Sequence, residues 1–429
     1  MFPDGVDTDR LYKAFDAFRR YNEAAENDIL LPRRQLASTL TRPEEDRLRE
    51  MMNQRLNACE NLLQVNGKIA WLIHEQGRSW LQWGVDTTFD PASQGHLATE
   101  EDHAIVRSTI RQIWRDWSKE SESERYPCHQ AVMEDVQNYS QRTPTEGAKR
   151  ILVPGAGLCR LPFNLAAAGH DVEANEVSYH QLLATNFILS YTREYAKHHI
   201  RNLAKSDSQI HLSRNGNQIE VYPWVTQFSN HVKTDDQFRH YSIPDLCPVD
   251  VLHEVPSFDF SSGTLGIKMA NLQINGRDFT KDFQGPEHSS AFDILATVFF
   301  LDTATNVLDY MRTAWHILKP GGQWINVGPL LWNCYENGPG GRREGDVDDD
   351  ENARARQVNG QQAVAPGKQW DMKIELSNQE ILALLEQIGF TLIRNNEDMK
   401  QAGYVRDTTS MLQNVYQCAH WVVEKPAED

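Results

Sequence analysis

The segment from residue 151 to residue 161, ILVPGAGLCRL, constrains the fold more than any other stretch of the chain. Its three leading aliphatic residues predict a short buried strand, and the sequence PGAG ends that strand at once. The apolar residues that follow predict a helix over residues 158–168. A strand, a glycine turn and a helix present backbone N–H groups to a nucleotide-like ligand. Gly155 and Gly157 fit this arrangement, because a Cβ at either position would keep the ligand away from the backbone.

A G-x-G turn by itself does not identify the ligand, since many strand-to-helix connections contain one. The next predicted strand, over residues 171–176, ends in Glu176, about 20 residues after Gly155. A carboxylate at that place can accept hydrogen bonds from both ribose hydroxyls. A dinucleotide-binding loop would carry a third glycine where this chain has Arg160. The sequence therefore favours S-adenosylmethionine over a dinucleotide as the cofactor.

A second informative pattern lies further along the chain. Residues 290–297 predict a strand, residues 303–318 a helix, and residues 323–327 another strand, with the turn sequence LKPGG between the last two. This succession is typical of Rossmann-like methyltransferases, in which the Pro-Gly-Gly turn ends the helix and reverses the chain. We therefore predict an α/β fold: a Rossmann-like class I methyltransferase sheet, with an N-terminal helical layer and an insertion between core elements.

The first third of the chain, residues 1–145, is predicted to be helical. A capping-box sequence that starts at Thr41 precedes a long amphipathic stretch, which predicts a helix over residues 46–75. Two more helices are expected over residues 99–117 and 122–139. We interpret this region as a helical layer that packs on the sheet.

Residues 146–429 are predicted to form the methyltransferase domain. Ser178 should cap the helix after the second strand, and residues 272–275 should form the third strand. Between them, residues 204–263 lose any clear periodicity, which indicates the insertion. Residues 338–368 are glycine-rich and highly charged, so we expect a disordered loop there. The chain should end with a helix over 381–388 that Ser377 caps, and with strands over 391–394 and 415–423.

Composition limits the classes of partner. The 429 residues include 43 basic and 60 acidic side chains, and the resulting net charge of −17 would repel a phosphate backbone, so no nucleic-acid partner is expected. The six cysteines lie far apart and lack the spacing of metal ligands, so no metal site is expected. The sequence contains no apolar run of membrane-spanning length and no signal-peptide core at its start. We expect a cytoplasmic protein without membrane association, and the nucleus is a second expected location.

Several longer strings carry a family resemblance. They are ILVPGAGL, YPWVxQFSN at residues 222–230, FFLDTAxNVLDY at 299–310 and LKPGGxWINxGPLL at 318–331. On these motifs, the chain from about residue 106 to residue 426 resembles the carnosine N-methyltransferase family. The resemblance implies that the protein transfers a methyl group from S-adenosylmethionine to an imidazole nitrogen of a histidine-containing dipeptide, in a reaction of the carnosine-to-anserine type.

The resemblance also implies which residues bind the cofactor. In the N-terminal region it points to Gln112 and Arg115, which are spaced i,i+3 and therefore share one face of a helix. Both could hold the methionine carboxylate, so the N-terminal region would contribute to the cofactor site. In the core the matched residues are Gly155, Glu176, Asp278, Phe279 and Ile294.

The implied substrate-binding residues are Asp302, Tyr404 and Tyr416, with Phe299 beside the imidazole ring. The chain departs from the family at Asn333, where members tend to have a histidine. An amide can still donate or accept a hydrogen bond to imidazole, but it cannot become charged.

Asp302 is the predicted catalytic residue. A neutral imidazole attacks the sulfonium methyl group through the nitrogen that carries the lone pair, so the other nitrogen must hold the proton. A carboxylate that accepts this N–H orients the ring and stabilises the developing imidazolium. No strong base is needed, because imidazole, with a pKa of about 6.5, is mostly neutral at about pH 7. Alternatively, Asp302 caps a helix that begins at Thr303.

Three functions are compatible with these motifs. The first is methylation of a small imidazole dipeptide, and the second is methylation of histidine side chains in proteins. The third is a cofactor-binding scaffold without turnover. The sequence leaves a homodimer open.

Overall fold

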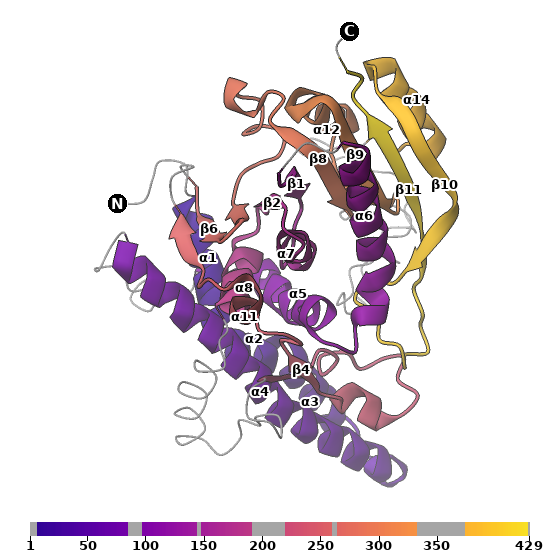
Figure 1. Cartoon of the computed structure of the whole chain (residues 1–429). Helices are drawn as coiled ribbons and strands as arrows, with labels where there is room; N and C mark the ends of the chain where they lie inside the picture. Colours follow the sequence, from indigo (N-terminus) through magenta and orange to yellow (C-terminus); the bar gives the residue numbers. More distant parts are fainter. Residues whose placement is uncertain are drawn as a thin grey trace, which may run out of the picture.

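The computed structural model describes residues 7–84, 97–143, 147–190, 219–259, 264–332 and 374–427. The predicted loop over 338–368 and the candidate Asn333 lie outside these residues. The described chain is organised around a nine-stranded sheet with the strand order β10-β11-β9-β8-β1-β2-β7-β6-β5. Figure 1 shows this sheet with helices against it and the N-terminal helices below.

The centre of the sheet is parallel. It consists of β1 (Arg150–Pro154), β2 (Asp171–Asn175), β7 (Leu272–Asn275), β8 (Phe292–Val298) and β9 (Leu318–Gly328). After β1 the chain builds outward through β2 and β7, and it then crosses to the other side of β1 to add β8 and β9. The strand order therefore reverses between β1 and β8, and in open α/β sheets ligands bind at the carboxyl ends of the strands at such a point. The predicted α/β fold class and its parallel strands are confirmed.

Antiparallel strands complete both edges of the sheet. On one side, β11 (Tyr416–Glu424) pairs with β9 and with β10 (Thr391–Ala402). On the other side, β6 (Gly266–Met269) pairs with β7 and with β5 (Ser257–Asp259). The predicted C-terminal strands are thus present, and β10 extends well beyond residue 394.

The described part of the predicted insertion has some order of its own. A separate two-stranded sheet joins β3 (Ile219–Val221) to β4 (Tyr241–Ile243), with a short 3-10 helix over Thr234–Phe238 between them. Helix α11 (Pro248–Leu252) follows. The last strand of the insertion, β5, joins the edge of the main sheet.

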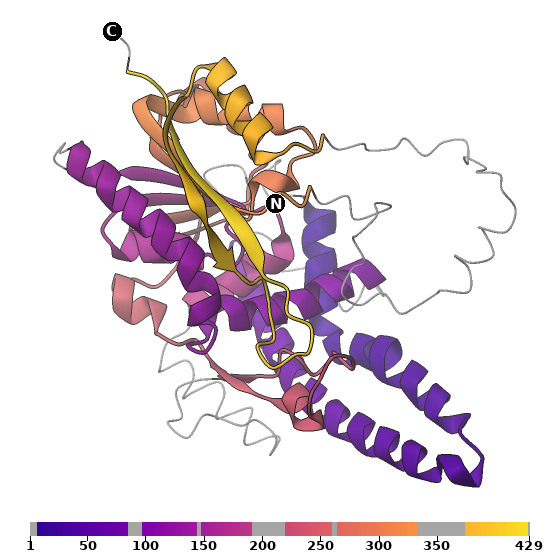
Figure 2. The same cartoon turned by 90° about the vertical axis from the view of Figure 1, so that its right-hand side faces the viewer.

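The N-terminal region is helical, as predicted. Its long helix, α4 (Asp46–Gly84), begins at the predicted residue, but its cap lies one residue later than predicted. The Glu45 carboxylate accepts the Arg42 N–H at 3.0 Å, in place of the predicted capping box at Thr41. Figure 2 shows α3 and α4 projecting as a hairpin. The elements are α1 (Thr8–Arg19), α2 (Tyr21–Ala25), a π-helix (Glu26–Leu30), α3 (Leu31–Ser38), α4 (Asp46–Gly84), α5 (Glu100–Trp117) and α6 (Glu122–Arg142).

Helices cover both faces of the sheet. Helix α6 packs against β9 and β10, and α12 (Val307–Ile317) and α14 (Asn378–Ile388) pack against the same strands from the other side (Figure 2). Helices α7 (Arg160–Ala167) and α8 (Tyr179–Leu189) follow β1 and β2. The predicted caps at Ser178 and Ser377 are confirmed, because each side chain accepts a backbone N–H of its helix.

The start of α12 corrects one prediction. Residues 301–303 form a 3-10 turn, and the helix begins only at Val307, where the Asn306 side chain accepts the Leu308 N–H at 3.2 Å. Asp302 is therefore not the N-cap of this helix. The LKPGG residues follow the helix directly and form the irregular start of β9, where the pairing with β8 skips from Leu318 to Gln323 and Gly321 has a φ of +76°. Within the described ranges, no helix is long and apolar enough to cross a membrane.

Candidate functional site

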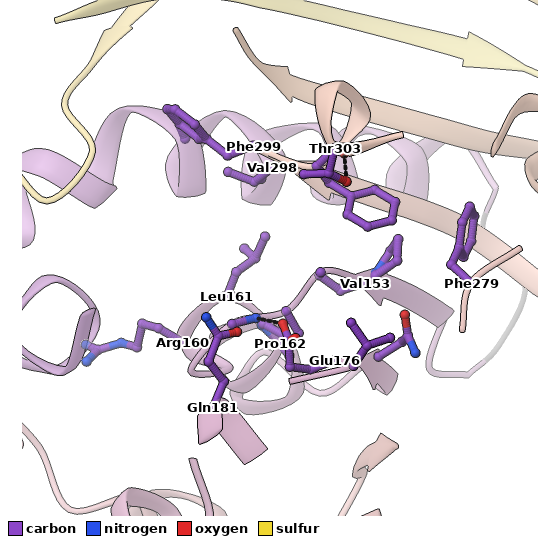
Figure 3. Close-up of a pocket in the computed structure, with 18 of the residues that line it drawn as sticks. Val153, Arg160, Leu161, Pro162, Glu176, Gln181, Phe279, Val298, Phe299 and Thr303 are labelled. Atoms are coloured by element: carbon purple, nitrogen blue, oxygen red, sulfur yellow. Dashed lines mark hydrogen bonds between the residues drawn. The ribbon is translucent and has the colours of Figure 1, made fainter. Parts of the chain in front are cut away.

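A cavity of about 670 Å³ opens at the carboxyl ends of the parallel strands, where the strand order reverses. Loops after β1, β2, β7 and β8 form one part of its wall, and residues of α5, α6, α7, α8, α12 and the segment after β10 complete it. Figure 3 shows Glu176 and Gln181 on one side of the cavity and Phe299 and Thr303 on the other. The position of the cavity is the one that the sheet topology predicts.

The glycine turn after β1 has the conformation that the sequence predicts. Gly155 and Gly157 have φ values of +62° and +56°, a left-handed conformation that favours glycine. A Cβ on Gly155 would lie only 2.4 Å from the Phe300 ring, whereas a Cβ on Gly157 would meet nothing closer than the Arg115 guanidinium at 3.8 Å. Glycine is thus required at residue 155 by the packing of Phe300. At residue 157, the absence of a side chain leaves space in the cavity next to the backbone.

Glu176 lies directly after β2, and its side chain is buried. The carboxylate accepts the N–H of Gly157 at 2.9 Å and the N–H of Ser178 at 2.8 Å. Burial raises the pKa of Glu176. The Gln181 side-chain amide lies between this carboxylate and the Gln112 amide. Glu176 therefore fixes the glycine turn and places a carboxylate in the cavity wall.

Asp278 and Phe279 follow β7 and line the same part of the cavity. Asp278 accepts the Thr280 N–H at 2.9 Å, which fixes the turn. The Phe279 ring packs edge-on against Phe300 at 5.5 Å and Tyr310 at 5.4 Å, and these two rings stack on each other at 4.7 Å. Sequence reasoning missed Phe300 and Tyr310. We call Gly155, Gly157, Glu176, Asp278 and Phe279 the strand-end group.

Three other described candidates, Ile294, Asp302 and Tyr416, do not line the cavity. Ile294 is fully buried in the middle of β8, in register with Ile151, and belongs to the sheet core. Asp302 is also buried, and its carboxylate accepts the N–H of Leu331 at 3.0 Å just after β9. Its neighbour Thr303 does line the cavity. The roles of Ile294 and Asp302 stay predictions.

Gln112 and Arg115 lie on α5 and both line the cavity, so they share the predicted face. The Arg115 guanidinium donates to the Asp116 carboxylate at 2.7 and 3.0 Å. It also lies 4.6 Å from the centre of the Tyr404 ring, within the range of a cation–π contact. Arg115 is thereby held at the boundary between α5 and the segment after β10.

Three aromatic residues from separate elements meet, and one of them, Tyr404, lies against Arg115. Phe299 follows β8 and has a φ of +52°. Its ring contacts Tyr404 at 5.2 Å and Tyr416, at the start of β11, at 5.9 Å. We call Phe299, Tyr404 and Tyr416 the aromatic group, and the Arg115 guanidinium lies against its Tyr404 ring. A flat, electron-rich surface of this kind suits a flat or cationic ring.

Sequence reasoning missed the polar wall behind Arg115. Arg160, which occupies the place of a third glycine, donates two hydrogen bonds to Asp245 at 2.6 and 2.9 Å. Arg125 donates to the same carboxylate at 3.1 Å. Asp245, a residue of the insertion, therefore links the start of α6 to the start of α7. Burial lowers the pKa of His129, in the same wall, to about 3. No local sequence signal marks these contacts, because their partners lie 85 and 120 residues apart.

Comparison with known proteins identifies the family. The family model described as carnosine N-methyltransferase matches residues 93–215 and 205–427. The chain belongs to the carnosine N-methyltransferase family. The mouse carnosine N-methyltransferase is 28% identical over 98% of this chain and 87% of its own length. The Schizosaccharomyces pombe carnosine N-methyltransferase is 31% identical over 74% of this chain and 69% of its own length.

Membership of the carnosine N-methyltransferase family confirms the resemblance and makes the chain a methyltransferase. Among solved structures, it is similar to the magnesium protoporphyrin IX methyltransferase of Synechocystis, with a TM-score of 0.33 and 10% identity over 75% of this chain and 98% of that one. The fold itself is established by the strand order of the sheet.

Proposed function

We propose that the protein transfers a methyl group from S-adenosylmethionine to an imidazole nitrogen of a carnosine-type dipeptide, giving an anserine-type product. Family membership supports this function. The observation that carries it is that one cavity joins the strand-end group to Phe299 and Tyr404 of the aromatic group. The first has the chemistry to hold a nucleoside, and the second has the chemistry to hold an imidazole.

The strand-end group fits S-adenosylmethionine. Gly157 leaves open space beside the backbone, where the cofactor can approach closely. Glu176 would accept the ribose hydroxyls, and Phe279 would pack on the adenine. On the opposite wall, Arg115 and Gln112 would hold the methionine carboxylate. The bound cofactor would supply an electrophilic methyl group on a positively charged sulfur.

The aromatic group would orient the acceptor. Phe299 and Tyr404 would hold the imidazole ring so that one nitrogen faces the methyl group, and alignment of this kind accounts for much of a transfer reaction. Asp302, which is buried directly before the cavity-lining Thr303, is our candidate for accepting the N–H of the other nitrogen, which would select the reactive tautomer and stabilise the positive charge that develops. The proton on that nitrogen remains in place during the transfer.

One incubation tests this function. The protein is mixed with isotope-labelled S-adenosylmethionine and either carnosine or a cell extract, and the products are separated by mass. We expect the label in the dipeptide and only when the protein is present. Label confined to protein histidines would favour a protein substrate, and binding of the cofactor without any transfer would favour a scaffold.

A further inference from the structure

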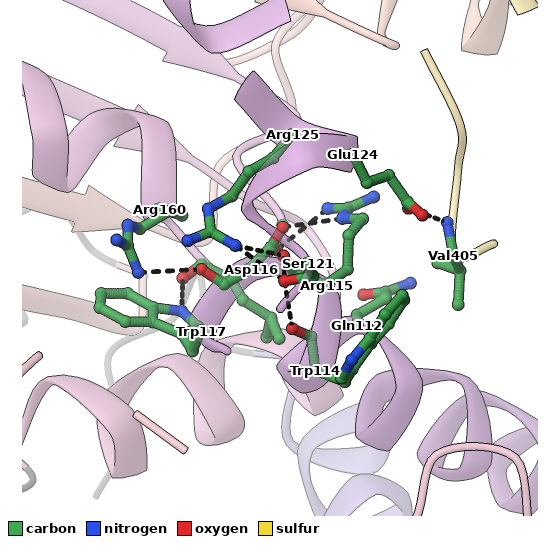
Figure 4. Close-up of polar contacts among 12 residues, drawn as sticks. Gln112, Trp114, Arg115, Asp116, Trp117, Ser121, Glu124, Arg125, Arg160 and Val405 are labelled. Carbon is green, nitrogen blue, oxygen red and sulfur yellow. Dashed lines mark hydrogen bonds and ion pairs between the residues drawn. The ribbon is translucent and has the colours of Figure 1, made fainter. Parts of the chain in front are cut away.

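Glu124, in the first turn of α6, is a buried carboxylate in the cavity wall, and sequence reasoning did not single it out. Its two oxygens accept backbone N–H groups from a distant segment. One accepts from Val405, and the other accepts from Arg406 at 2.9 Å. Figure 4 shows the Glu124 carboxylate reaching from the helix to Val405. A carboxylate on two consecutive N–H groups is a strong, charge-assisted contact.

The segment that Glu124 holds, residues 403–406, has a conformation that its own sequence disfavours. Val405 has a φ of +54°, although β-branched residues rarely adopt left-handed backbone angles. At Gly403, a Cβ would lie 3.2 Å from the side chain of Arg406 and 3.3 Å from a Glu124 oxygen, so the turn packs closely on the carboxylate. Such a conformation persists only where the surroundings enforce it, and Glu124 provides that enforcement.

The turn presents Tyr404 to the aromatic group. Tyr404 is 42% exposed, so its own packing does little to fix the ring. Its position depends on contacts to Phe299 at 5.2 Å and to the Arg115 guanidinium at 4.6 Å, and on the backbone conformation of the turn. Without the carboxylate, the turn can relax at Val405, and the ring would leave the wall of the cavity.

We infer that Glu124 is a positioning residue for the methyl acceptor, which holds the turn 403–406 so that Tyr404 completes the aromatic group. The inference rests on the proposed function for the identity of the acceptor. Glu124 acts through Tyr404 and does not touch the reacting atoms. A direct contact between Glu124 and the amino group of the dipeptide is the competing explanation.

The test uses the full chain with Glu124→Gln and Glu124→Ala, and with Glu122→Gln as the matched control, because Glu122 lies exposed in the same helical turn. Glutamine keeps one acceptor oxygen, so we expect a graded effect. The KM for carnosine should rise about 10-fold in Glu124→Ala and less in Glu124→Gln, while the dissociation constant for S-adenosylmethionine changes less than about 2-fold. Hydrogen exchange at Val405 and Arg406 should accelerate in both variants. Glu122→Gln should change none of these quantities.

Each outcome decides the inference. Unchanged exchange at Val405 and Arg406 would show that Glu124 does not hold the turn. Faster exchange with an unchanged KM would show that the turn does not position the acceptor. Parallel measurements with N-acetylcarnosine, which lacks the charged amino group, separate the competing explanation: a rise in KM with carnosine but not with N-acetylcarnosine would mean direct recognition of the amino group. If the wild-type protein transfers no methyl group to carnosine, the proposed function is wrong. The hydrogen-exchange measurement then still tests whether Glu124 fixes the turn 403–406.

Discussion

The strand-end group lines one cavity together with Phe299 and Tyr404 of the aromatic group, but the two groups are built in different ways. Each member of the strand-end group lies within a few residues of the end of β1, β2 or β7, and the backbone of the sheet fixes its place. Members of the aromatic group come from the end of β8, from the segment after β10 and from the start of β11. Their side chains meet only when these distant elements have packed.

This difference implies that cofactor binding by the strand-end group and acceptor binding by the aromatic group can be lost independently. Local changes in the strand-end group should weaken the cofactor and leave the acceptor site intact. Changes that disturb long-range contacts, such as those of Glu124, should do the reverse. Four variants would break or sharpen this distinction.

The largest effect is expected from Gly155→Ala. The new Cβ would lie 2.4 Å from Phe300, whose ring supports Phe279, and the residue would keep an unfavourable φ. Overpacking and backbone strain together should weaken binding of S-adenosylmethionine about 100-fold or more, as measured by calorimetry. Gly169→Ala is the control, because Gly169 has a φ of +94° but nothing within 4 Å of the new Cβ. It should cost only about 1 kcal/mol of stability. Affinity within a few-fold of wild type in Gly155→Ala would contradict the packing argument.

Asp302→Asn should lower turnover about 100-fold, because an amide cannot stabilise the developing imidazolium as a carboxylate does. Its oxygen can still accept the Leu331 N–H, so thermal stability and cofactor affinity should stay near wild type. Turnover and cofactor binding are measured separately. Wild-type turnover in Asp302→Asn would rule out the catalytic role.

Glu176→Ala should weaken cofactor binding by about 1–3 kcal/mol, because the ribose would lose a carboxylate partner and the Gly157 N–H would lose its acceptor. At saturating cofactor, the KM for carnosine should not change. Glu176→Gln keeps one acceptor and should lose less. Undiminished affinity in Glu176→Ala would refute the ribose role, and a raised KM would show that the two groups are not separable.

The smallest effect concerns the framework that both groups share. Burial of His180, on α8 against Phe18, lowers its pKa to about 4. An unfolded histidine has a pKa of about 6.5, so the unfolded chain binds this proton more readily as the pH falls below that value. The stability that His180 contributes is complete above about pH 6.5 and is lost progressively toward pH 4. At pH 5.5 the free energy of unfolding should be lower by about 1 kcal/mol than above pH 6.5, and this difference should be absent in His180→Gln. Urea unfolding of both proteins at pH 5.5 and above about pH 6.5 measures the free energy of unfolding at each pH. An equal loss of stability in the wild type and in His180→Gln would contradict the prediction.

The same contrast explains what the sequence could predict. The strands, the glycine turn and Glu176 follow from a local pattern, and the register of β1 with β2 then fixes their geometry. Phe299, Tyr404 and Tyr416 entered only through the family resemblance, since nothing local shows that they meet. Glu124 could not be predicted at all, because its partner Val405 lies 281 residues away.

Two errors in the predicted helix caps, one of which also shifted a helix start, have a physical cause. At Thr303, the hydroxyl donates to the Phe300 carbonyl at 2.7 Å and closes a 3-10 turn. The helix therefore begins only at Val307, after the Asn306 cap. Before α4, Glu45 rather than Glu44 reaches back to a backbone N–H. In both places several capping residues compete, and tertiary packing decides among them.

The proposal that the aromatic group holds the acceptor beside the cofactor can be tested by one binding measurement. Carnosine is titrated calorimetrically into the protein saturated with S-adenosylhomocysteine, the demethylated cofactor, so that no turnover occurs. We predict saturable binding at one site in the wild type, and binding weaker by about tenfold in Phe299→Ala, because the ring loses its aromatic contact. Equal affinity in the two proteins, or no binding in the wild type, would contradict it.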